Sequence, residues 1–258
     1  MKLSYSVVLY NQLPADIRKL YRNIVETVPR GASYHIFFIN NSPKNHDINV
    51  ILHEFEKNDQ HFTAIFPLVN RGFGAGHNLA VKQLDSEYHF IVNPDVKIPN
   101  AEQISQMIGY MQVNKVVLLN PRIVGSDGQT QKLVKRRPTV FDLALRFVGG
   151  WAFPKRQAQF VYDGHYDQEH EAEVVSGSFM VCQTAALQQV NGFDERFFLY
   201  MEDTDLSRKM FELGTVAYYP NAYIVHEWQR QNRRSVKGIL QMLNSMRKYF
   251  NKWGWRFV

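Results

Sequence analysis

Short apolar segments alternate with helical patterns through the first 120 residues, and this alternation constrains the fold more than any other feature. The apolar segments are rich in β-branched and aromatic residues, which favour strands. Pro14 and Pro99 lie just ahead of helical patterns, where the first turn of a helix accepts proline. The pattern predicts an α/β fold with a mostly parallel central sheet flanked by helices. The expected strands are Leu3–Tyr10, Tyr34–Asn40, Phe62–Val69, Tyr88–Val92 and Val116–Leu119, and the expected helices are Ala15–Thr27, Asp47–Lys57, Ala75–Leu84 and Ala101–Val113.

The second half of the chain is less regular. No repeat and no linker divides it, so we expect one domain over residues 1–230, followed by a basic amphipathic helix within residues 231–258. Residues 151–173 are polar and are expected to form a loop. The other expected elements are helices over Thr139–Val148, Asp203–Leu213 and Ser235–Trp253, and strands over Val174–Cys182, Thr215–Tyr219 and Ala222–Val225.

The composition is that of an ordinary globular protein, with 45% hydrophobic and 21% charged residues among 258. Cys182 is the only cysteine, which excludes an intrachain disulfide framework and a cysteine-rich zinc site. No apolar run approaches the roughly 18 residues of a membrane span. Leu3–Tyr10 lacks the cleavage pattern of a signal peptide, so we expect a cytoplasmic protein.

Positive charge is concentrated at the C-terminal end of the chain. The net charge is +6, yet no acidic residue follows Glu227. The charge suits anionic lipid or a phosphorylated substrate, and no nucleic-acid motif accompanies it. An amphipathic basic helix can lie on anionic lipid, pack on the domain or join two copies, and the sequence leaves these open. The basic residues are Arg230, Arg233, Arg234, Lys237, Arg247, Lys248, Lys252 and Arg256.

Polar residues follow the expected strands at their carboxyl ends, where α/β sheets bind ligands. Asn93-Pro94-Asp95 comes directly after one apolar strand. A carboxylate at this place can hold Mg²⁺, which takes one or two protein carboxylates and completes its shell with phosphates and water. The same three residues also favour a simple turn.

A glycine-rich segment, residues 70–78, follows another expected strand and opens a helix. Gly72, Gly74 and Gly76 allow a close backbone approach to a phosphate, and Arg71 can add donors. The G-x-G-x-G spacing follows the third strand rather than the first, unlike the dinucleotide fingerprint. A dinucleotide site and a plain glycine turn both stay open as alternatives.

Three carboxylates, Glu202, Asp203 and Asp205, follow an aromatic and apolar run. Acidic residues suit the first turn of a helix, which explains one or two of them. The apolar run is expected to bury them in part and to raise at least one pKa, which creates a candidate general base. His226 ends another expected strand and is either a structural residue or a ligand, with imidazole better suited to Mn²⁺ than to Mg²⁺.

Taken in order, these segments resemble a known family. They are Tyr10-Asn11, residues 39–43, 70–78, 93–95, 175–180, 191–198 and 202–206, and His226. The set is similar to the inverting family 2 glycosyltransferases of the GT-A fold, and within them to the rhamnosyltransferase-like branch of O-antigen and capsule synthesis. The resemblance covers about residues 3–230.

The resemblance implies a role for individual residues. Asp95 stands at the metal motif of the family, and His226 matches a residue that ligates the metal or meets the diphosphate. Asp203 matches the catalytic base, with Glu202 beside it. Asn93 and Asn40 replace acids that the family has at the metal motif and at the nucleobase. The residues implied to line the donor site are Tyr10, Asn11, Asn40, Arg71, Gly72, Gly76, Asn78, Asn93 and Asp95.

The implied function is a metal-dependent, inverting transfer of rhamnose or a hexose. The donor would be a dTDP- or UDP-linked sugar, the metal Mg²⁺ or Mn²⁺, and the acceptor a polyprenyl-diphosphate-linked saccharide at the inner membrane face. Two alternatives stay open. One is an NAD(P)-dependent oxidoreductase that uses Gly72–Gly76. The other is a non-catalytic binding or assembly module, which Asn40 and Asn93 allow and the clustered carboxylates argue against.

Overall fold

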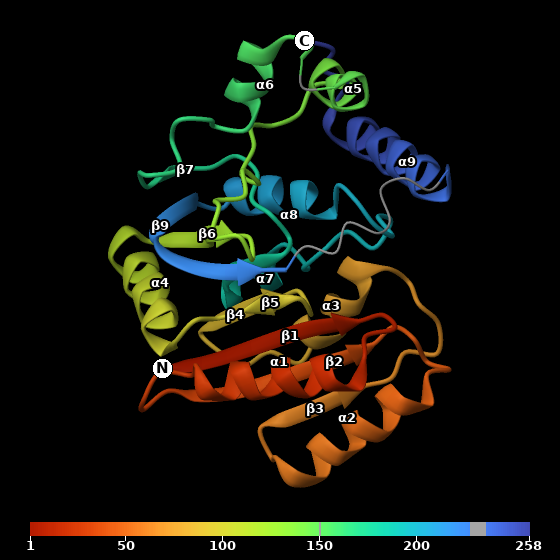
Figure 1. The fold of residues 1–258 in the computed structure, drawn as a ribbon, viewed down its shortest axis with the longest axis vertical. Helices are drawn as coiled ribbons and strands as arrows, with labels where there is room; N and C mark the ends of the chain where they lie inside the picture. The colour runs from red at the N-terminus through yellow and green to blue at the C-terminus, as the bar shows by residue number, and fades with distance from the viewer. Residues whose placement is uncertain (150, 228–235) are drawn as a thin grey trace.

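The computed structural model describes residues 1–149, 151–227 and 236–258. Within them the chain forms one mixed sheet with helices on both faces (Figure 1). The strands are β1 (Lys2–Leu9), β2 (Ser33–Asn40), β3 (Phe62–Ile65), β4 (Tyr88–Val92), β5 (Val96–Lys97), β6 (Val116–Val124), β7 (His170–Glu171), β8 (Phe179–Gln183) and β9 (Thr215–His226). The helices are α1 (Pro14–Glu26), α2 (His46–Asn58), α3 (Phe73–Val81), α4 (Ala101–Asn114), α5 (Val140–Val148), α6 (Pro154–Phe160), α7 (Thr184–Gln189), α8 (Glu202–Phe211) and α9 (Val236–Trp253).

The sheet has the strand order β3-β2-β1-β4-β8-β6-β9-β5, and β7 pairs with β9. The first four strands in this order are parallel. β8 is antiparallel to both of its neighbours, β4 and β6, and β9 then runs parallel to β6. The short strands β5 and β7 are antiparallel to β9. The predicted α/β sheet with flanking helices is therefore confirmed, with parallel pairing in its N-terminal half and mixed pairing beyond β4.

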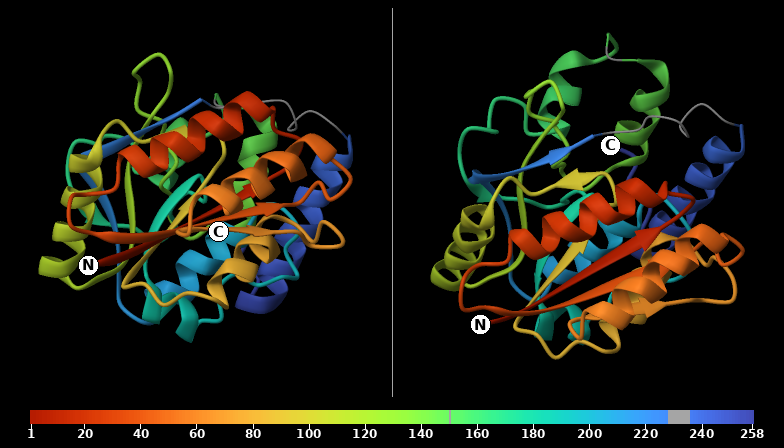
Figure 2. Two further views of the ribbon diagram at one scale, coloured as in Figure 1. Left: turned by 90° about the horizontal axis from the view of Figure 1, so that it is seen from below. Right: turned by 60° about the horizontal axis from the view of Figure 1, so that its bottom comes forward.

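Two apolar cores cover the two faces of the sheet. α1, α2 and α4 pack on one face, and α3, α7 and α8 pack on the other. Figure 2 shows α1 and α2 side by side on the first of these faces. β1 contributes to both cores, since Tyr5 and Val7 point into the first and Val8 into the second. Helices therefore cover both faces of the sheet around β1, β2 and β4, and the carboxyl ends of these strands extend from a packed region.

A third apolar cluster lies beyond the sheet and fixes α9. Met246, Tyr249 and Phe250 of α9 are buried there against Leu143 of α5 and Phe197 of the segment before α8. The backbone of residues 256 and 257 also accepts hydrogen bonds from the start of α5. The apolar stripe of α9 is thus largely used inside the molecule. The proposed boundary between residues 230 and 231 lies outside the described residues.

Most elements predicted for the first 120 residues are confirmed, with ends that differ by a few residues. Two strand ends differ more, since β3 ends at Ile65 and β6 continues to Val124. The prediction of a loop over residues 151–173 is wrong, because this segment contains α6 and β7. The strand predicted from Val174 begins only at Phe179.

Pro220 does not divide its segment into two strands. β9 runs from Thr215 to His226, and its pairing with β6 steps from Pro121↔Tyr219 to Arg122↔Tyr223. The irregularity places Pro220 where no ladder hydrogen bond is required of its nitrogen. The strand therefore continues and delivers His226 to the edge of the sheet.

Among the described residues, no helix combines the length and the hydropathy that a membrane span requires.

Candidate active site at the strand ends

Asp95 and His226 come together from two segments far apart in the sequence. Asp95 follows β4, His226 ends β9, and Nε2 of the imidazole lies 3.2 Å from Oδ1 of the carboxylate. Gln131 holds the histidine on its other side, since its Oε1 lies 3.2 Å from Nδ1 and its amide donates to the backbone oxygen of His226 at 3.1 Å. His226 is only 5% exposed, so the ring is held in one orientation.

The oxygens at this place have the properties that a hard cation requires. Oδ1 of Asn93 is buried and has no hydrogen-bond partner, and Oδ1 of Asp95 is buried with Nε2 of His226 as its polar neighbour. Two ligands at about 2.1 Å from an octahedral metal, at a right angle to each other, lie about 3.0 Å apart, which is close to the Asp95–His226 spacing. No group of three or more His, Cys, Asp or Glu side chains that could hold a metal occurs in the described parts of the chain. The residues thus fit a metal whose shell is completed by phosphate and water.

Glu202 and Asp203 begin α8, as the sequence predicts within one residue. The two residues before the helix, Tyr200 and Met201, have positive φ angles of 69° and 67°. Residues other than glycine and asparagine rarely adopt this conformation, and it costs about 1–3 kcal/mol when the surroundings impose it. The segment is therefore held in a strained turn that sets the direction in which both carboxylates point.

The two carboxylates have different surroundings. Glu202 is buried, and its Oε2 has no hydrogen-bond partner. Burial, and then the neighbouring Asp203 carboxylate, raise the pKa of Glu202 to about 8. Asp203 is half-buried and accepts from the backbone nitrogen of Thr204 at 2.7 Å. Glu202 is thus mainly protonated at pH 7, which leaves Asp203 as the candidate base.

Residues 176–178 connect the Asp203 side of the site with the strand end at residues 93–95. The backbone nitrogen of Asn93 donates to the carbonyl of Ser178 at 2.9 Å. The backbone nitrogen of Gly177 lies 3.4 Å from Oδ2 of Asp203. A Cβ atom at Gly177 would stand 3.2 Å from Cβ of Asp203, so glycine allows this approach. Asn93, two residues before the predicted metal ligand Asp95, and the predicted base Asp203 therefore border the same short loop.

The glycine-rich segment is packed inside the protein. A Cβ atom at Gly72 would lie 2.2 Å from the carbonyl oxygen of Phe198, and Gly72 has φ +106°. A Cβ atom at Gly76 would lie 2.8 Å from Val8, and one at Gly74 would lie 2.6 Å from Phe193. These glycines serve close packing of α3 on the sheet and on the segment before α8, and the structure gives no reason to assign them to a dinucleotide.

Asn78 and Asn40 use their side chains within the chain. Nδ2 of Asn78 donates to the backbone carbonyl of Phe193 at 2.8 Å, and Oδ1 of Asn78 accepts from the backbone nitrogen of Phe193 at 2.8 Å. The amide of Asn40 donates to Oδ1 of Asn49 at 2.7 Å, and its oxygen accepts from the nitrogen of Ser42 at 2.8 Å. Asn40 is fully buried and Asn78 nearly so. Both residues position loops that surround the site.

Tyr10, Asn11 and Arg71 remain accessible beyond the strand ends. Tyr10 is 57% exposed, and Asn11 donates its backbone nitrogen to Oγ of Ser42 at 2.9 Å. Asn11 has a positive φ of 59°, which asparagine tolerates. The Arg71 side chain is exposed and lies 3.8 Å from Oε2 of Glu195. These side chains are free to meet a ligand that enters from solvent.

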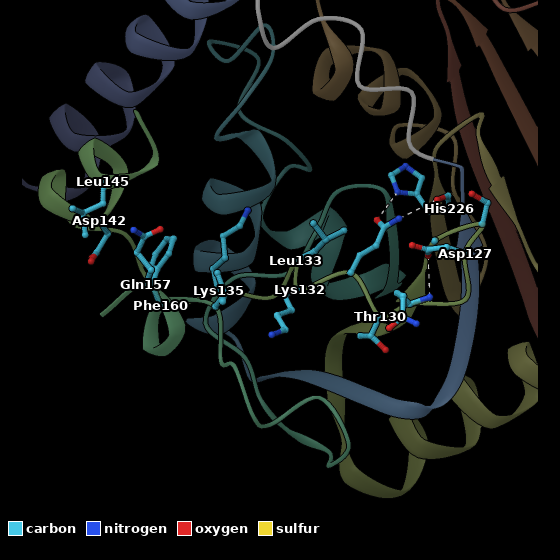
Figure 3. Close-up of a pocket in the computed structure, with 15 residues that line it drawn as sticks. Asp127, Thr130, Lys132, Leu133, Lys135, Asp142, Leu145, Gln157, Phe160 and His226 are labelled. Atoms are coloured by element: carbon cyan, nitrogen blue, oxygen red, sulfur yellow. Dashed lines mark hydrogen bonds between the residues drawn. The ribbon is translucent and has the colours of Figure 1, made fainter. Parts of the chain in front are cut away.

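A cavity of about 570 Å³ begins at His226 and extends towards α5 and α6 (Figure 3). His226 and Asp127 lie at one end, Asp142 and Leu145 lie at the other, and Lys132 and Lys135 stand between them. The lining is mainly polar, with serine, threonine, glutamine and lysine side chains. Such a lining suits a saccharide or another hydroxyl-rich ligand.

The sequence does not predict the role of Gln131 at this site or the contacts of Asp205. Gln131 lies 95 residues from His226 in the chain, and no local pattern distinguishes it from a surface glutamine. Asp205 belongs to the predicted acidic cluster, but its partners lie far along the chain, in the last turn of α9. Its Oδ1 accepts from Nε1 of Trp253 at 2.7 Å and lies 2.7 Å from Nζ of Lys252. The one local signal is that Asp205 belongs to an acidic cluster that directly follows an aromatic and apolar run, which predicts burial but not the partner.

The sheet, its flanking helices and a carboxylate–histidine pair at the strand ends define a GT-A fold. The structure superposes on GalNAc-T7, solved with UDP, GalNAc and Mn²⁺, with a TM-score of 0.70 at 10% identity, over 95% of this chain and 47% of that one. The sequence model described as "Glycosyl transferase family 2" matches residues 4–167, which is more than half of the chain. The chain therefore belongs to glycosyl transferase family 2.

Curated relatives point to one branch of the family. The chain is 26% identical over 171 residues to the N-acetylglucosaminyl-diphospho-decaprenol L-rhamnosyltransferase of Mycobacterium tuberculosis, which covers 61% of this chain and 56% of the relative. It is 24% identical over 172 residues to the rhamnosyltransferase WbbL of Escherichia coli K12, covering 63% of each. The aligned region thus spans less than two thirds of either relative's length.

Proposed function

We propose that this protein is an inverting glycosyltransferase that moves a sugar from a nucleoside diphosphate to a hydroxyl group of a saccharide. The observation that carries the proposal is the placement of Asp203 and Asn93 on either side of residues 176–178, with the Asp95–His226 pair at the same strand end. A base and a diphosphate site must flank the anomeric carbon in a single displacement, and these side chains border one loop.

Asp203 acts as the general base. The acceptor hydroxyl oxygen forms a bond to the anomeric carbon, its proton passes to Asp203, and the bond from that carbon to the diphosphate oxygen breaks. The electron pair of the broken bond stays on the nucleoside diphosphate. General-base catalysis of this kind contributes about 10² to 10⁴ in rate. Attack from the face opposite the leaving group inverts the anomeric centre, and no covalent enzyme intermediate is formed.

Asp95 and His226, with Asn93 beside them, hold the diphosphate end of the donor. A Mg²⁺ or Mn²⁺ ion bound there would neutralise charge on the leaving diphosphate. Gln131 keeps the ring of His226 in place, the buried oxygen of Asn93 has no hydrogen-bond partner, and Asp95 and His226 would bind the ion together in place of their mutual contact. Tyr10, Asn11 and Arg71 then contact the nucleotide from the solvent side, while Asn40, Asn78 and the glycines shape the loops around it.

The relatives guide the choice of substrates. One relative's name gives rhamnose and a diphosphate-linked decaprenol, so we assign a dTDP- or UDP-linked rhamnose or hexose as donor and a polyprenyl-diphosphate-linked saccharide as acceptor. With such an acceptor, we propose that the enzyme works at the cytoplasmic face of the inner membrane as a peripheral protein; a homodimer is a separate proposal that the acceptor does not bear on. Surface polysaccharide synthesis is the process that this chemistry serves.

Thermal unfolding with dTDP, UDP, GDP and NADH, each with and without Mn²⁺, tests the donor site. A ligand at 100 times its Kd adds about 2.7 kcal/mol of stability. We expect a metal-dependent rise in Tm with one pyrimidine diphosphate, lost in Asp95→Asn. A rise with NADH alone would contradict the proposal.

The variant Asp203→Asn tests the base. We expect an unchanged nucleotide-induced rise in Tm and a transfer rate lower by about 10² to 10⁴, because the amide cannot accept the proton. Asp85→Asn, at an exposed acid that pairs with Lys2, is the matched control. Full activity of Asp203→Asn would remove the assignment, and nucleotide binding without transfer by the wild type would favour the non-catalytic module.

A further inference from the structure

A second, apolar hollow adjoins the polar cavity at α5 and α6. It has a volume of about 350 Å³ and is lined by Phe141, Ala144, Leu145, Val148, Trp151, Ala152 and Phe153. Leu145 lines both the polar cavity and this hollow. The buried side chain of Leu145 therefore borders both a polar space that begins at His226 and a space with no charged lining residue.

The apolar hollow is open to solvent and lies at one end of the molecule. Its rim is formed by Val148, Trp151 and Phe153, which are 51%, 80% and 61% exposed. Figure 1 shows α5 and α6 at the end opposite β3 and α2, beyond the sheet. Exposed aromatic and aliphatic side chains around an apolar hollow are costly in water and mark a binding surface for an apolar ligand.

The α5–α6 turn is built so that this hollow keeps its shape. The amide of Gln157 donates to the carbonyl of Gly149 at 2.9 Å and also to the carbonyl of Ala152. Phe141 and Phe153 pack edge to face with ring centroids 5.2 Å apart. Gln157 also lines the polar cavity, so one side chain fixes the border between the two spaces.

We infer that the two spaces bind the two parts of one amphiphilic acceptor. This inference rests on the proposed function and extends it. The saccharide and diphosphate occupy the polar cavity, where Lys135 faces the phosphates and Lys132, paired with Asp163 at 2.5 Å, adds positive charge nearby. The hydrocarbon chain crosses Leu145 into the apolar hollow. The continuity at Leu145 favours a chain attached to the polar ligand over a separate bilayer or a second copy of the protein.

Two probes test the inference without knowledge of the natural acceptor: farnesyl diphosphate and inorganic diphosphate. Both are titrated into the full chain saturated with Mn²⁺ and the nucleotide that the donor test selects, so that the donor site is filled. We expect farnesyl diphosphate to bind at least about tenfold more tightly, because its hydrocarbon chain leaves water when it enters the hollow. Equal affinity for the two probes would overturn the inference.

The variants Val148→Ser and Trp151→Ser locate the apolar part. Both side chains are exposed, so their loss spares the fold, and we expect about a tenfold weaker Kd for farnesyl diphosphate with no change for inorganic diphosphate. Val113→Ser, at a residue of α4 that is 81% exposed, is the matched control. Lys135→Gln should weaken the binding of both probes.

Three outcomes would contradict the inference. The rim variants could lower binding to phosphatidylglycerol vesicles and leave farnesyl diphosphate binding unchanged, which would make the hollow a bilayer contact. They could instead convert a dimer to a monomer in sedimentation, which would make it an interface. The third outcome is that the rim variants change neither farnesyl diphosphate binding, nor vesicle binding, nor the oligomeric state. A nucleotide-induced rise in Tm that persists in these variants would show that the proposed function stands even where the acceptor inference fails.

Discussion

At the residue scale, the contrast between Glu202 and Asp203 is the main electrostatic feature of the site. They are neighbours in the chain, yet one is buried with an unpaired oxygen and the other accepts hydrogen bonds at the edge of the loop. In the proposed mechanism, a protonated Glu202 does not compete with Asp203 for the proton of an acceptor hydroxyl. Environment therefore separates the roles of two adjacent carboxyl groups.

The raised pKa of Glu202 predicts how stability changes with pH. Its pKa is about 8 in the folded protein, compared with an ordinary value of 4.5. The stability associated with the protonated form is therefore fully present below pH 4.5 and is lost as pH rises through about 8. Urea unfolding between pH 5 and pH 9 should show wild type losing stability relative to Glu202→Gln.

The control for this measurement is Glu212→Gln, at an exposed carboxyl group just after α8. The difference in free energy of unfolding between wild type and Glu212→Gln should stay constant between pH 5 and pH 9. A constant difference between wild type and Glu202→Gln across the range would mean that Glu202 is ionised throughout.

At the element scale, α9 is held on α8 by a buried polar contact as well as by its apolar stripe. Oδ1 of Asp205 accepts from the indole of Trp253 and lies 2.7 Å from Nζ of Lys252. Lys252 also lies 2.8 Å from Asp194, whose pKa is held far below its usual range by Arg196 first and then by Lys252. Lys252, one of the basic residues for which the sequence left lipid contact, packing and dimer contact open, is thus paired inside the molecule.

Trp253→Phe should destabilise the protein by about 1–3 kcal/mol, because it leaves the fully buried Asp205 without one of its donors. The measurement is the free energy of unfolding in urea. Trp255→Phe is the matched control, because its indole donates to Asn251 at an exposed position, at 2.9 Å. The control should change stability by less than about 0.5 kcal/mol. If the two substitutions lowered the free energy of unfolding equally, the hydrogen bond from Trp253 to Asp205 would not contribute to stability.

At the scale of the whole molecule, a buried chain of polar side chains connects β1, β4 and α3 on the face of the sheet that α3 covers. Oγ of Ser6 lies 2.7 Å from Nδ1 of His77 and 2.8 Å from Nε2 of His89. Oγ of Ser4 lies 2.7 Å from Nδ1 of His89. Burial lowers the pKa of His89 to about 3 and that of His77 well below its ordinary value. Both rings are therefore neutral in the folded protein.

These two histidines predict acid sensitivity. The unfolded chain binds a proton at each near pH 6.5, and the folded chain does not until about pH 3 at His89. The contribution of these two histidines to stability is therefore complete above pH 6.5 and falls as pH drops, by about 1.4 kcal/mol per pH unit for each histidine. Urea unfolding at pH 7, 6 and 5 measures how the free energy of unfolding changes with pH. His89→Gln should reduce this slope by about 1.4 kcal/mol per pH unit. An unchanged slope in this variant would contradict the assignment.

The GT-A sheet and most of its helices follow from the sequence, because strand and helix periodicity are local properties. The ordered motifs also predict Asp95, Asp203 and His226 as site residues. The sequence does not foresee α6, the single β9 or the internal roles of Gly76 and Asn78. Each of these depends on partners distant in the chain, such as Val8 for Gly76 and Phe193 for Asn78.

The sequence by itself determined the family, the alternation of elements and the chemistry available at the strand ends. Only the tertiary structure decided which carboxyl group is buried, that Gln131 supports His226, and that a polar cavity and an apolar hollow meet at Leu145. The physical reason is that patterns along a chain report the preferences of neighbouring residues. Desolvation, hydrogen-bond pairing and the shape of a cavity are set by side chains that meet only when the chain has folded.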